Sequence, residues 1–417
     1  MRNSTVLLPV SHRLSTQNAN DNSNPRALYI HIPFCQVRCT YCAFNIYTRR
    51  AQTIPDYLNA LAAELRWLAE SARVADRTIR LETVYIGGGT PSLLSAEQIS
   101  QLLAQCRAAF TIPADAEISL EVNPDDSRDS TYFSQIGDCG VNRLSIGMQS
   151  ADAEEVHRFA RLHRLQAVEK TVNAARLAGQ NNISLDLIYG APLQTIDTWY
   201  RTLDAALAMQ PDHLSLYALQ VEPGTTMSRW ISQGKLPMPD DDLTADMYAL
   251  ADDLLAGAGL QQYEISTWAR PGHECAHNLH YWHNHSFIGI GAGAHGSTVD
   301  GRYRVTSALD RYIRLALEQN APAPFPRTAA TEEWLAVSPI QAMDETVMTE
   351  LRLTRQGLNR AAFTTRFGVP VEVAYAAAFE RVAVFDMLDI GPERICLRPA
   401  ARLISNQILL HFMRDSV

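Results

Sequence analysis

The sequence lacks three features that would place it in large classes of protein. Seven cysteines in 417 residues, an odd number, do not form the framework of a disulfide-rich secreted domain. No stretch approaches the roughly 18 consecutive apolar residues of a membrane-spanning helix. Lys and Arg number 36 against 45 Asp and Glu, and this balance argues against a general binder of nucleic acid or acidic membranes. We therefore expect a cytoplasmic protein that meets a membrane only through a partner.

The chain is long enough for one large domain with a smaller companion. Within residues 1–25, the run STQNANDNSN has Ala19 as its one apolar residue, so it cannot bury enough surface to offset the entropy of ordering. We expect residues 1–25 to be a disordered extension. Three further parts are expected: a large α/β domain at 26–240, an elaboration of it at 241–329, and a C-terminal domain of helices and a small hairpin, of winged-helix type, at 330–417.

Six short β-rich runs recur along the large domain, with helix-like segments between them. In the first such segment Leu58, Leu61, Leu65 and Leu68 share one face of a helix. Alternation of this kind indicates a parallel sheet with right-handed crossovers. We expect an incomplete (β/α)6 barrel, although the pattern alone does not separate it from an open, doubly wound sheet. The predicted strands are 27–32, 83–86, 118–122, 143–148, 183–189 and 213–219.

Polar and glycine-rich residues stand where these runs end. GGGTP occupies 87–91 after the second run, and EVNP and DLIYG end the third and the fifth. Parallel α/β proteins build their sites at the carboxyl ends of their strands. These segments are therefore expected to converge on one mouth.

Three cysteines, Cys35, Cys39 and Cys42, lie within eight residues just after the first predicted strand. Three thiolates at this spacing bind three corners of a cubane iron–sulfur cluster and leave the fourth iron with an open position. From the spacing alone two other interpretations stay open: a zinc site completed by a distant residue, and three unrelated buried cysteines.

This cysteine spacing, with an aromatic residue, Tyr41, before the last cysteine, resembles the signature of the radical S-adenosylmethionine (SAM) superfamily. The GGGTP segment resembles the loop that meets the methionyl amine of SAM in that family. The resemblance implies a [4Fe-4S] cluster held by Cys35, Cys39 and Cys42, with SAM chelating the open iron. In the family, one electron from the cluster cleaves SAM to a 5′-deoxyadenosyl radical, so the cofactor carries the difficult chemistry.

The similarity continues into the coproporphyrinogen-oxidase-like family, and it implies the residues that line SAM. Glu121 and Asp186 are suited to accept hydrogen bonds from the ribose or the amine, and Arg161 to meet a carboxylate; ion pairs at the mouth or helix caps are the alternative. Ala160 stands where this family usually has glycine. No catalytic residue is assigned. The implied SAM residues are Tyr29, Tyr41, Gly88, Gly89, Thr90, Glu121, Gln149, Arg161, Asp186, Ala218 and His295.

A second group of residues, between 273 and 285, is rich in histidine. It contains an H-N-x-x-Y-W motif that the family associates with heme, made of His277, Asn278, Tyr281 and Trp282. Imidazole is an axial ligand of heme iron, and flat aromatic rings pack against a porphyrin. His277 is the preferred candidate ligand and Cys275 a weaker one that is equally suited to be a small buried residue. Several histidines of this group are expected to be surface residues; those beside the motif are His273, His280, His283 and His285.

Two functions of this family compete for the chain. Its oxidases carry a further cysteine two residues after the last cysteine of the triad, where this chain has Phe44. We therefore favour a heme chaperone that binds the cluster, SAM and heme and transfers heme to an acceptor apoprotein. The alternative is an oxygen-independent coproporphyrinogen III oxidase, an oxidoreductase, and a zinc-stabilised barrel is a third hypothesis. An electron donor, if SAM is cleaved, and a homodimer are the other partners considered.

Overall fold

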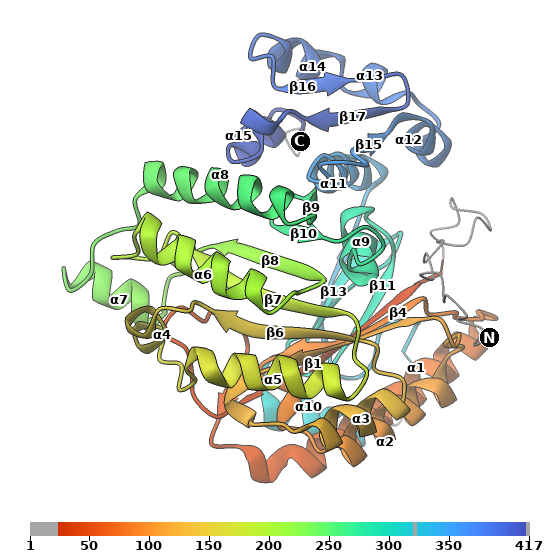
Figure 1. Ribbon diagram of the computed structural model, residues 1–417. Helices are drawn as coiled ribbons and strands as arrows, with labels where there is room; N and C mark the ends of the chain where they lie inside the picture. The colour runs from red at the N-terminus through yellow and green to blue at the C-terminus, as the bar shows by residue number, and fades with distance from the viewer. Residues whose placement is uncertain (1–23, 320–322, 414–417) are drawn as a thin grey trace, which may run out of the picture.

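The computed structural model describes residues 24–319 and 323–413. The predicted extension at 1–25 therefore lies, apart from its last two residues, outside the described residues. Figure 1 shows a twisted sheet covered by helices, with a smaller C-terminal group of helices and strands beside it. The sheet and its helices share one hydrophobic core that runs from Leu28 to Ala330, and the C-terminal group has a core of its own. The boundaries at 240 and 329 stay predictions.

All six predicted strands are present, and they pair in parallel in the order of the sequence. The α/β fold expected from the alternating pattern is confirmed. Apolar residues of β1 such as Leu28 and Ile30 are fully buried, because they face the helices. The strands are β1 (Ala27–Ile32), β4 (Thr83–Gly88), β5 (Glu117–Val122), β6 (Arg143–Gln149), β7 (Ile183–Tyr189) and β8 (His213–Ala218).

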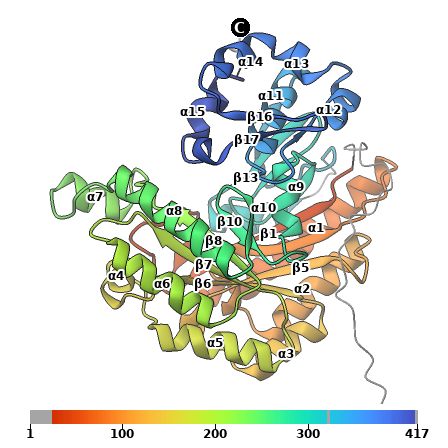
Figure 2. The same cartoon turned by 45° about the horizontal axis from the view of Figure 1, so that its top comes forward.

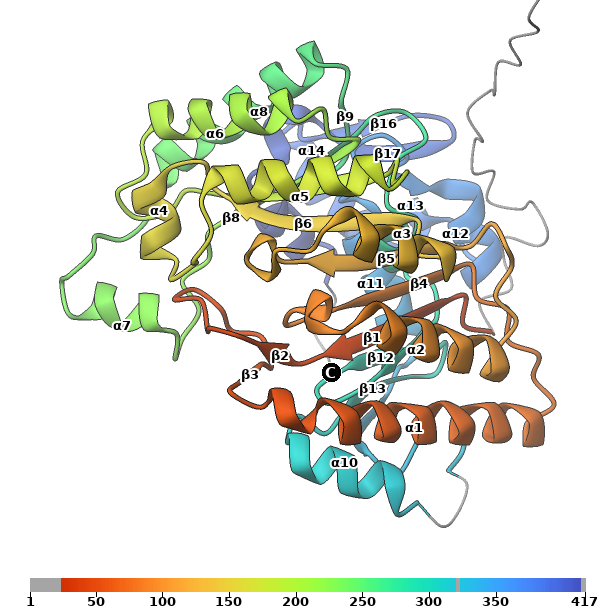
Figure 3. The ribbon, with the colours of Figure 1, turned by 60° about the horizontal axis from the view of Figure 1, so that its bottom comes forward.

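The crossover helices cover one face of this parallel sheet, where α1 packs against α2, α2 against α3, and α3 against α5. Figure 3 shows α1, α2, α3 and α5 on the side of the strands that faces the viewer. A one-sided arrangement is that of a partial barrel, whereas a doubly wound sheet carries helices on both faces. The helices are α1 (Ile54–Val74), α2 (Ala96–Ala109), α3 (Ser130–Asp138), α4 (Ala153–Arg158), α5 (Leu165–Leu177) and α6 (Ile196–Ala208).

Strands that the sequence did not indicate extend both edges of the sheet. β11 joins β1 in parallel, and β12, β13 and β14 continue in antiparallel fashion. On the other edge β10 and β9 follow β8. These strands are β9 (Gln261–Glu264), β10 (Thr267–Ala269), β11 (Phe287–Ile290), β12 (His295–Ser297), β13 (Gly301–Val305) and β14 (Thr331–Ala336).

The C-terminal part combines five helices with a small antiparallel sheet in the order β15, β17, β16. Its core includes Val347, Phe363 and Phe412, and Figure 2 shows it standing above the large sheet. Its elements are α11 (Pro339–Glu350), β15 (Leu358–Asn359), α12 (Arg360–Phe367), α13 (Val371–Ala374), α14 (Ala376–Ala383), β16 (Leu388–Ile390), β17 (Arg394–Leu397) and α15 (Ser405–Leu410).

The remaining elements are short or peripheral. Among the described residues, none of the helices combines the length and the apolar character needed to cross a bilayer. They are β2 (Phe34–Cys35), β3 (Tyr47–Thr48), α7 (Thr226–Ser232), α8 (Asp241–Gly257), α9 (Ala276–Trp282) and α10 (Leu309–Leu317).

Candidate functional site

A cavity of about 470 Å³, here called the first cavity, opens at the carboxyl ends of the parallel strands. The three cysteines of the triad line it, together with eight of the eleven residues that the family resemblance places around SAM. The structure thus brings the strand-end residues together, while the role of each stays a prediction. The eight are Tyr41, Gly88, Gly89, Thr90, Glu121, Gln149, Arg161 and Asp186.

The triad lies on a loop that a distant part of the chain holds in place. β2 and β3 pair at the base of this loop, at the end of the sheet where Figure 3 also shows α7. The Asn45 side chain donates hydrogen bonds to the carbonyl oxygens of Ala292 and Ser307, at 2.9 and 3.0 Å. The Tyr47 hydroxyl donates to the same Ser307 oxygen at 2.7 Å. The segment after β11 therefore fixes the position of the cysteines.

The three thiols are half-buried and free of disulfides. Burial raises the pKa of Cys35 to about 11 and also raises the pKa of Cys42. Two groups oppose this at Cys35: the Thr90 hydroxyl, which donates to its Sγ at 3.4 Å, and the Arg161 guanidinium. A metal that binds these thiols at neutral pH must displace their protons.

This donor set fits an iron–sulfur cluster. Three thiols lie in one cavity with open space beside them. Within the part of the chain that the structure describes, no three His, Cys, Asp or Glu side chains converge as ligands of a single metal ion do. A cubane cluster does not need such convergence, because each cysteine binds a different iron.

The glycine loop after β4 has no room for side chains. Gly88 adopts φ +116°, and a Cβ atom there would lie 2.5 Å from the ring of His31. At Gly89 a Cβ atom would lie 2.7 Å from the carbonyl oxygen of Phe34, a backbone atom that cannot turn away. Glycine is therefore required here by the close approach of β1 and the loop after it.

Two carboxyl groups face the first cavity. Glu121 accepts hydrogen bonds from the Gly88 backbone N–H at 2.9 Å and from the Tyr85 hydroxyl at 3.1 Å. Asp186 accepts from the Ser145 hydroxyl at 2.9 and 3.0 Å. Burial raises the pKa of Glu121 to about 7 and raises the pKa of Asp186 as well. Both carboxyl groups are placed to accept hydrogen bonds from a polar ligand.

Arg161 supplies a cation to the same cavity. Its Nη1 donates to the Asn123 side-chain oxygen at 2.9 Å, and its buried Nε has no partner among the described residues. Ala160, where the family usually has glycine, adopts φ +58°, a conformation that favours glycine. The departure from the family pattern therefore strains the backbone but leaves the Arg161 side chain in the cavity lining.

Three predicted SAM residues do not line the first cavity. The Tyr29 hydroxyl lies 3.0 Å from His31 Nδ1 inside the barrel. Ala218 is exposed, and its neighbour Tyr217 lines the cavity in its place. His295 lies on β12, in the lining of a different cavity.

Ser145 and Tyr217 line the first cavity although the sequence did not single them out. Successive residues of a strand point to opposite faces. Steps of two back from Gln149 along β6 lead to Gly147 and Ser145. Strand alternation could therefore have identified Ser145 from the sequence.

The H-N-x-x-Y-W motif forms α9, and its histidine is built into the interior. His277 is 1% exposed. Its Nδ1 lies 2.8 Å from the Thr83 hydroxyl and its Nε2 lies 2.7 Å from the Tyr281 hydroxyl, so both ring nitrogens are hydrogen-bonded. Burial lowers its pKa well below the usual value. Glu117 accepts the backbone N–H of His277 at 3.0 Å and thereby holds the start of α9.

A second cavity, of about 480 Å³, lies beside the end of α9, between the β11–β14 strands and α11. Tyr281 of the motif is part of its wall, as are Phe287 of β11 and Tyr303 of β13. His285 and His295 also line this second cavity. The histidine-rich segment thus borders a cavity that is separate from the first one in its lining residues.

A sequence model of the Radical SAM superfamily matches residues 29–206. The heme chaperone HemW of Mycobacterium tuberculosis is 37% identical over 388 residues, which cover 92% of this chain and 94% of that protein. The heme chaperone HemW of Bacillus subtilis is 32% identical over 391 residues, which cover 94% of this chain and all of that protein, 100%.

Among solved structures, coproporphyrinogen III oxidase (HemN) from Escherichia coli, described as a radical SAM enzyme, is similar with a TM-score of 0.78. The match covers 94% of this chain and 91% of that chain at 24% identity. At this identity the similarity shows a shared fold.

Proposed function

Because the chain belongs to the radical SAM superfamily, and within it to the family of the heme chaperone HemW, we propose that it binds a [4Fe-4S] cluster, SAM and heme and passes heme to an acceptor apoprotein. The observation that carries this proposal is the match to HemW relatives over nearly the whole of both chains. It spans both the first cavity with its thiols and the second cavity with its aromatic wall.

Cys35, Cys39 and Cys42 would hold the cluster, and the SAM-contacting side chains would be those that line the same cavity. The cluster, when bound, supplies a Lewis-acidic iron and one-electron chemistry. The protein's own residues would orient SAM and neutralise its carboxylate. The Gly88–Gly89 backbone would allow SAM to approach closely. The carboxyl oxygens of Glu121 and Asp186 would accept hydrogen bonds from SAM, and the Arg161 cation would meet its carboxylate.

The residue two positions after the triad supports a carrier over an oxidase. Phe44 occupies the position where the oxidases of this family have a cysteine, and it is 68% exposed in the lining of the first cavity. An aromatic ring there offers no thiol to the chemistry of a porphyrinogen. We accordingly place the protein in heme delivery, in the cytoplasm, with an apoprotein as recipient.

Anaerobic reconstitution followed by heme titration tests the proposal. We expect a stoichiometric Soret band and transfer of that heme to an apoprotein such as apomyoglobin mixed in at equal concentration. The same sample, supplied with SAM, a reductant and coproporphyrinogen III, should form no protoporphyrinogen. Porphyrinogen decarboxylation, or the absence of any Soret band, would remove the chaperone assignment.

A further inference from the structure

We propose that heme is held in the second cavity with His285 as its iron ligand, rather than with His277 of the motif; this rests on the proposed heme-carrier function. Because His277 is buried, its ability to bind heme iron depends on whether a ring nitrogen is free. With both nitrogens hydrogen-bonded to Thr83 and Tyr281, its ring has no lone pair free for iron unless a bond inside the core breaks. A different imidazole has to be considered.

The second cavity has the size and the lining of a site for a flat apolar ligand. Its volume of about 480 Å³ falls within the roughly 300–1,000 Å³ of small-molecule pockets. Tyr281 and Phe287 supply aromatic rings to this lining, and their ring centroids lie 4.5 Å apart. Leu335 also lines it and is 57% exposed, so an apolar surface stands open there and would be covered by a bound porphyrin.

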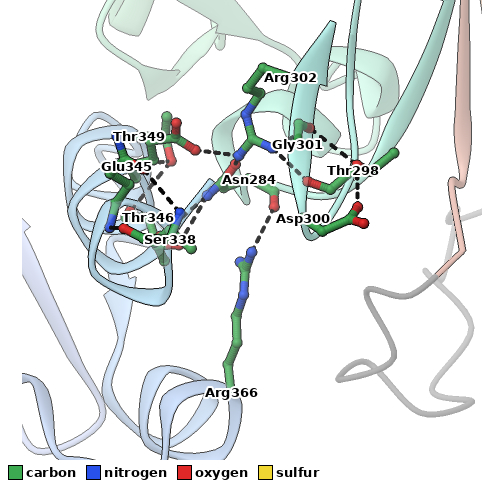
Figure 4. A network of polar contacts seen from close by, with 12 residues as sticks. Asn284, Thr298, Asp300, Gly301, Arg302, Ser338, Glu345, Thr346, Thr349 and Arg366 are labelled. Atoms are coloured by element: carbon green, nitrogen blue, oxygen red, sulfur yellow. Dashed lines mark hydrogen bonds and ion pairs between the residues drawn. The ribbon is translucent and has the colours of Figure 1, made fainter. Parts of the chain in front are cut away.

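The floor of this cavity follows from strand alternation. Phe287 pairs with Ser297, Ser297 with Arg302, and Arg302 with Leu335 across β11 to β14, so these four side chains share one face of the sheet. The wall comes from Tyr281 at the end of α9 and from α11. Figure 4 shows Arg302 reaching from β13 to Glu345 of α11 and to the Asn284 side chain, which ties the floor to the wall.

Cations are available for the two propionate groups of heme. Arg302 and Arg304 both lie in the lining. In this structure Arg302 is paired with Glu345, and Arg304 with Glu332 and Glu333. A bound dicarboxylate would exchange with these glutamates.

His285 is oriented as ligand histidines commonly are. Its Nδ1 lies 3.1 Å from Nδ1 of His280. His280 is 2% exposed, and its Nε2 faces the Glu82 carboxylate at 3.6 Å. Metal-binding histidines usually have such a hydrogen bond on the nitrogen that does not touch the metal. The Glu82 carboxylate lies too far from His280 Nε2 for a hydrogen bond and acts on it by charge alone.

The same contacts determine which nitrogen of each ring carries the proton. The 3.1 Å contact between the two Nδ1 atoms requires one ring to donate and the other to accept. A proton on His280 Nε2, directed at Glu82, leaves its Nδ1 to accept the N–H of His285 Nδ1. His285 Nε2 then carries a free lone pair, and among the described residues it has no hydrogen bond.

Neighbouring histidines lack this arrangement. His283 does not line the cavity, and its Nε2 is bonded to Gln356 at 2.9 Å. His295 lines the cavity but has no hydrogen bond within the described residues that would orient its ring. His285 therefore combines a lining position, a fixed ring and a free nitrogen.

Heme titration of the full-length, reconstituted protein and its variants tests the assignment. We expect His285→Ala to lose the Soret band at heme concentrations that saturate the wild type, and exogenous imidazole to restore it in His285→Gly. His280→Gln should weaken heme binding by roughly 10-fold, because a group that orients a ligand contributes on that scale. His283→Ala is the matched control, and it and His295→Ala should bind as the wild type does.

His277→Gln separates the two assignments, because its amide can still bond Thr83 and Tyr281. We expect this variant to keep the Soret band. If it loses the band while His285→Ala keeps it, or if His285→Ala binds heme as well as the wild type, the assignment is overturned and heme carriage stands. If the wild type shows no band, both proposals fail. Far-UV circular dichroism of each variant identifies any that does not fold, and imidazole rescue then decides the question.

Discussion

Replacing Glu121 by glutamine should make the cluster-free protein more stable at alkaline pH. Burial raises the pKa of Glu121 from 4.5 to about 7, and the nearby Asp186 adds to the rise. A difference of about 2.5 in pKa, at about 1.4 kcal/mol for each tenfold change, corresponds to about 3 kcal/mol as an upper bound. The unfolded chain releases the proton near pH 4.5, whereas the folded protein keeps it until about pH 7.

The direction of the change in stability with pH follows from this difference in pKa. A raised carboxyl pKa stabilises the folded state fully below pH 4.5, and the contribution is lost as pH rises to about 7. In urea unfolding we expect the wild type and Glu121→Gln to be similar at pH 4.5. At pH 8 the variant should be more stable by up to about 3 kcal/mol.

The control is Glu169→Gln, which removes an exposed carboxylate from α5. It should show the same pH dependence as the wild type. If Glu121→Gln and the wild type differ by the same amount at pH 4.5 and pH 8, the carboxyl is not held neutral by burial and the reasoning is wrong. The stabilised variant should bind SAM up to about 10-fold more weakly, as expected when a hydrogen bond to the ligand is weakened.

Three further substitutions test the first cavity. Gly88→Ala places a Cβ atom 2.5 Å from the His31 ring at φ +116°; we expect it to be destabilising by about 1–3 kcal/mol in urea unfolding and to abolish SAM binding measured by calorimetry, and wild-type behaviour would contradict the need for glycine. Cys39→Ala should lose the visible absorption of the reconstituted cluster, while Cys106→Ala, which changes a buried cysteine of α2, should retain it. Ala160→Gly relieves φ +58° and should raise the free energy of unfolding by up to about 1 kcal/mol, and a loss of stability would show that the backbone there is unstrained.

The parallel part of the fold was predictable because its signal is local. Each of the six runs is long enough to show strand composition, and the helices between them show their apolar face, as Leu61 and Leu65 do. The strands at the sheet edges are short and interrupted by Gly and His, and their pairings are set by distant partners. β11 joins β1 from more than 250 residues away, and a short strand carries little pattern of its own.

The first cavity was also largely predictable, since residues at strand ends must meet at one mouth. His277 shows where this reasoning ends. A histidine in an aromatic motif suits heme, but its burial depends on Thr83, 194 residues earlier in the chain. Equally, nothing in the segment from 273 to 285 indicates that Glu82 lies beside one of its histidines, His280.

The hydrogen bonds that hold the cysteine loop join residues that are synthesised at different times. The ribosome releases the three cysteines early, but Asn45 and Tyr47 bond to Ser307, 262 and 260 residues later. At about 5–20 residues per second, translation takes roughly 10–50 s to cover that distance. For that interval the nascent loop is unanchored and its thiols are open to incoming iron and sulfide. Synthesis of the segment around Ser307 then supplies the carbonyl oxygen that holds the loop in place.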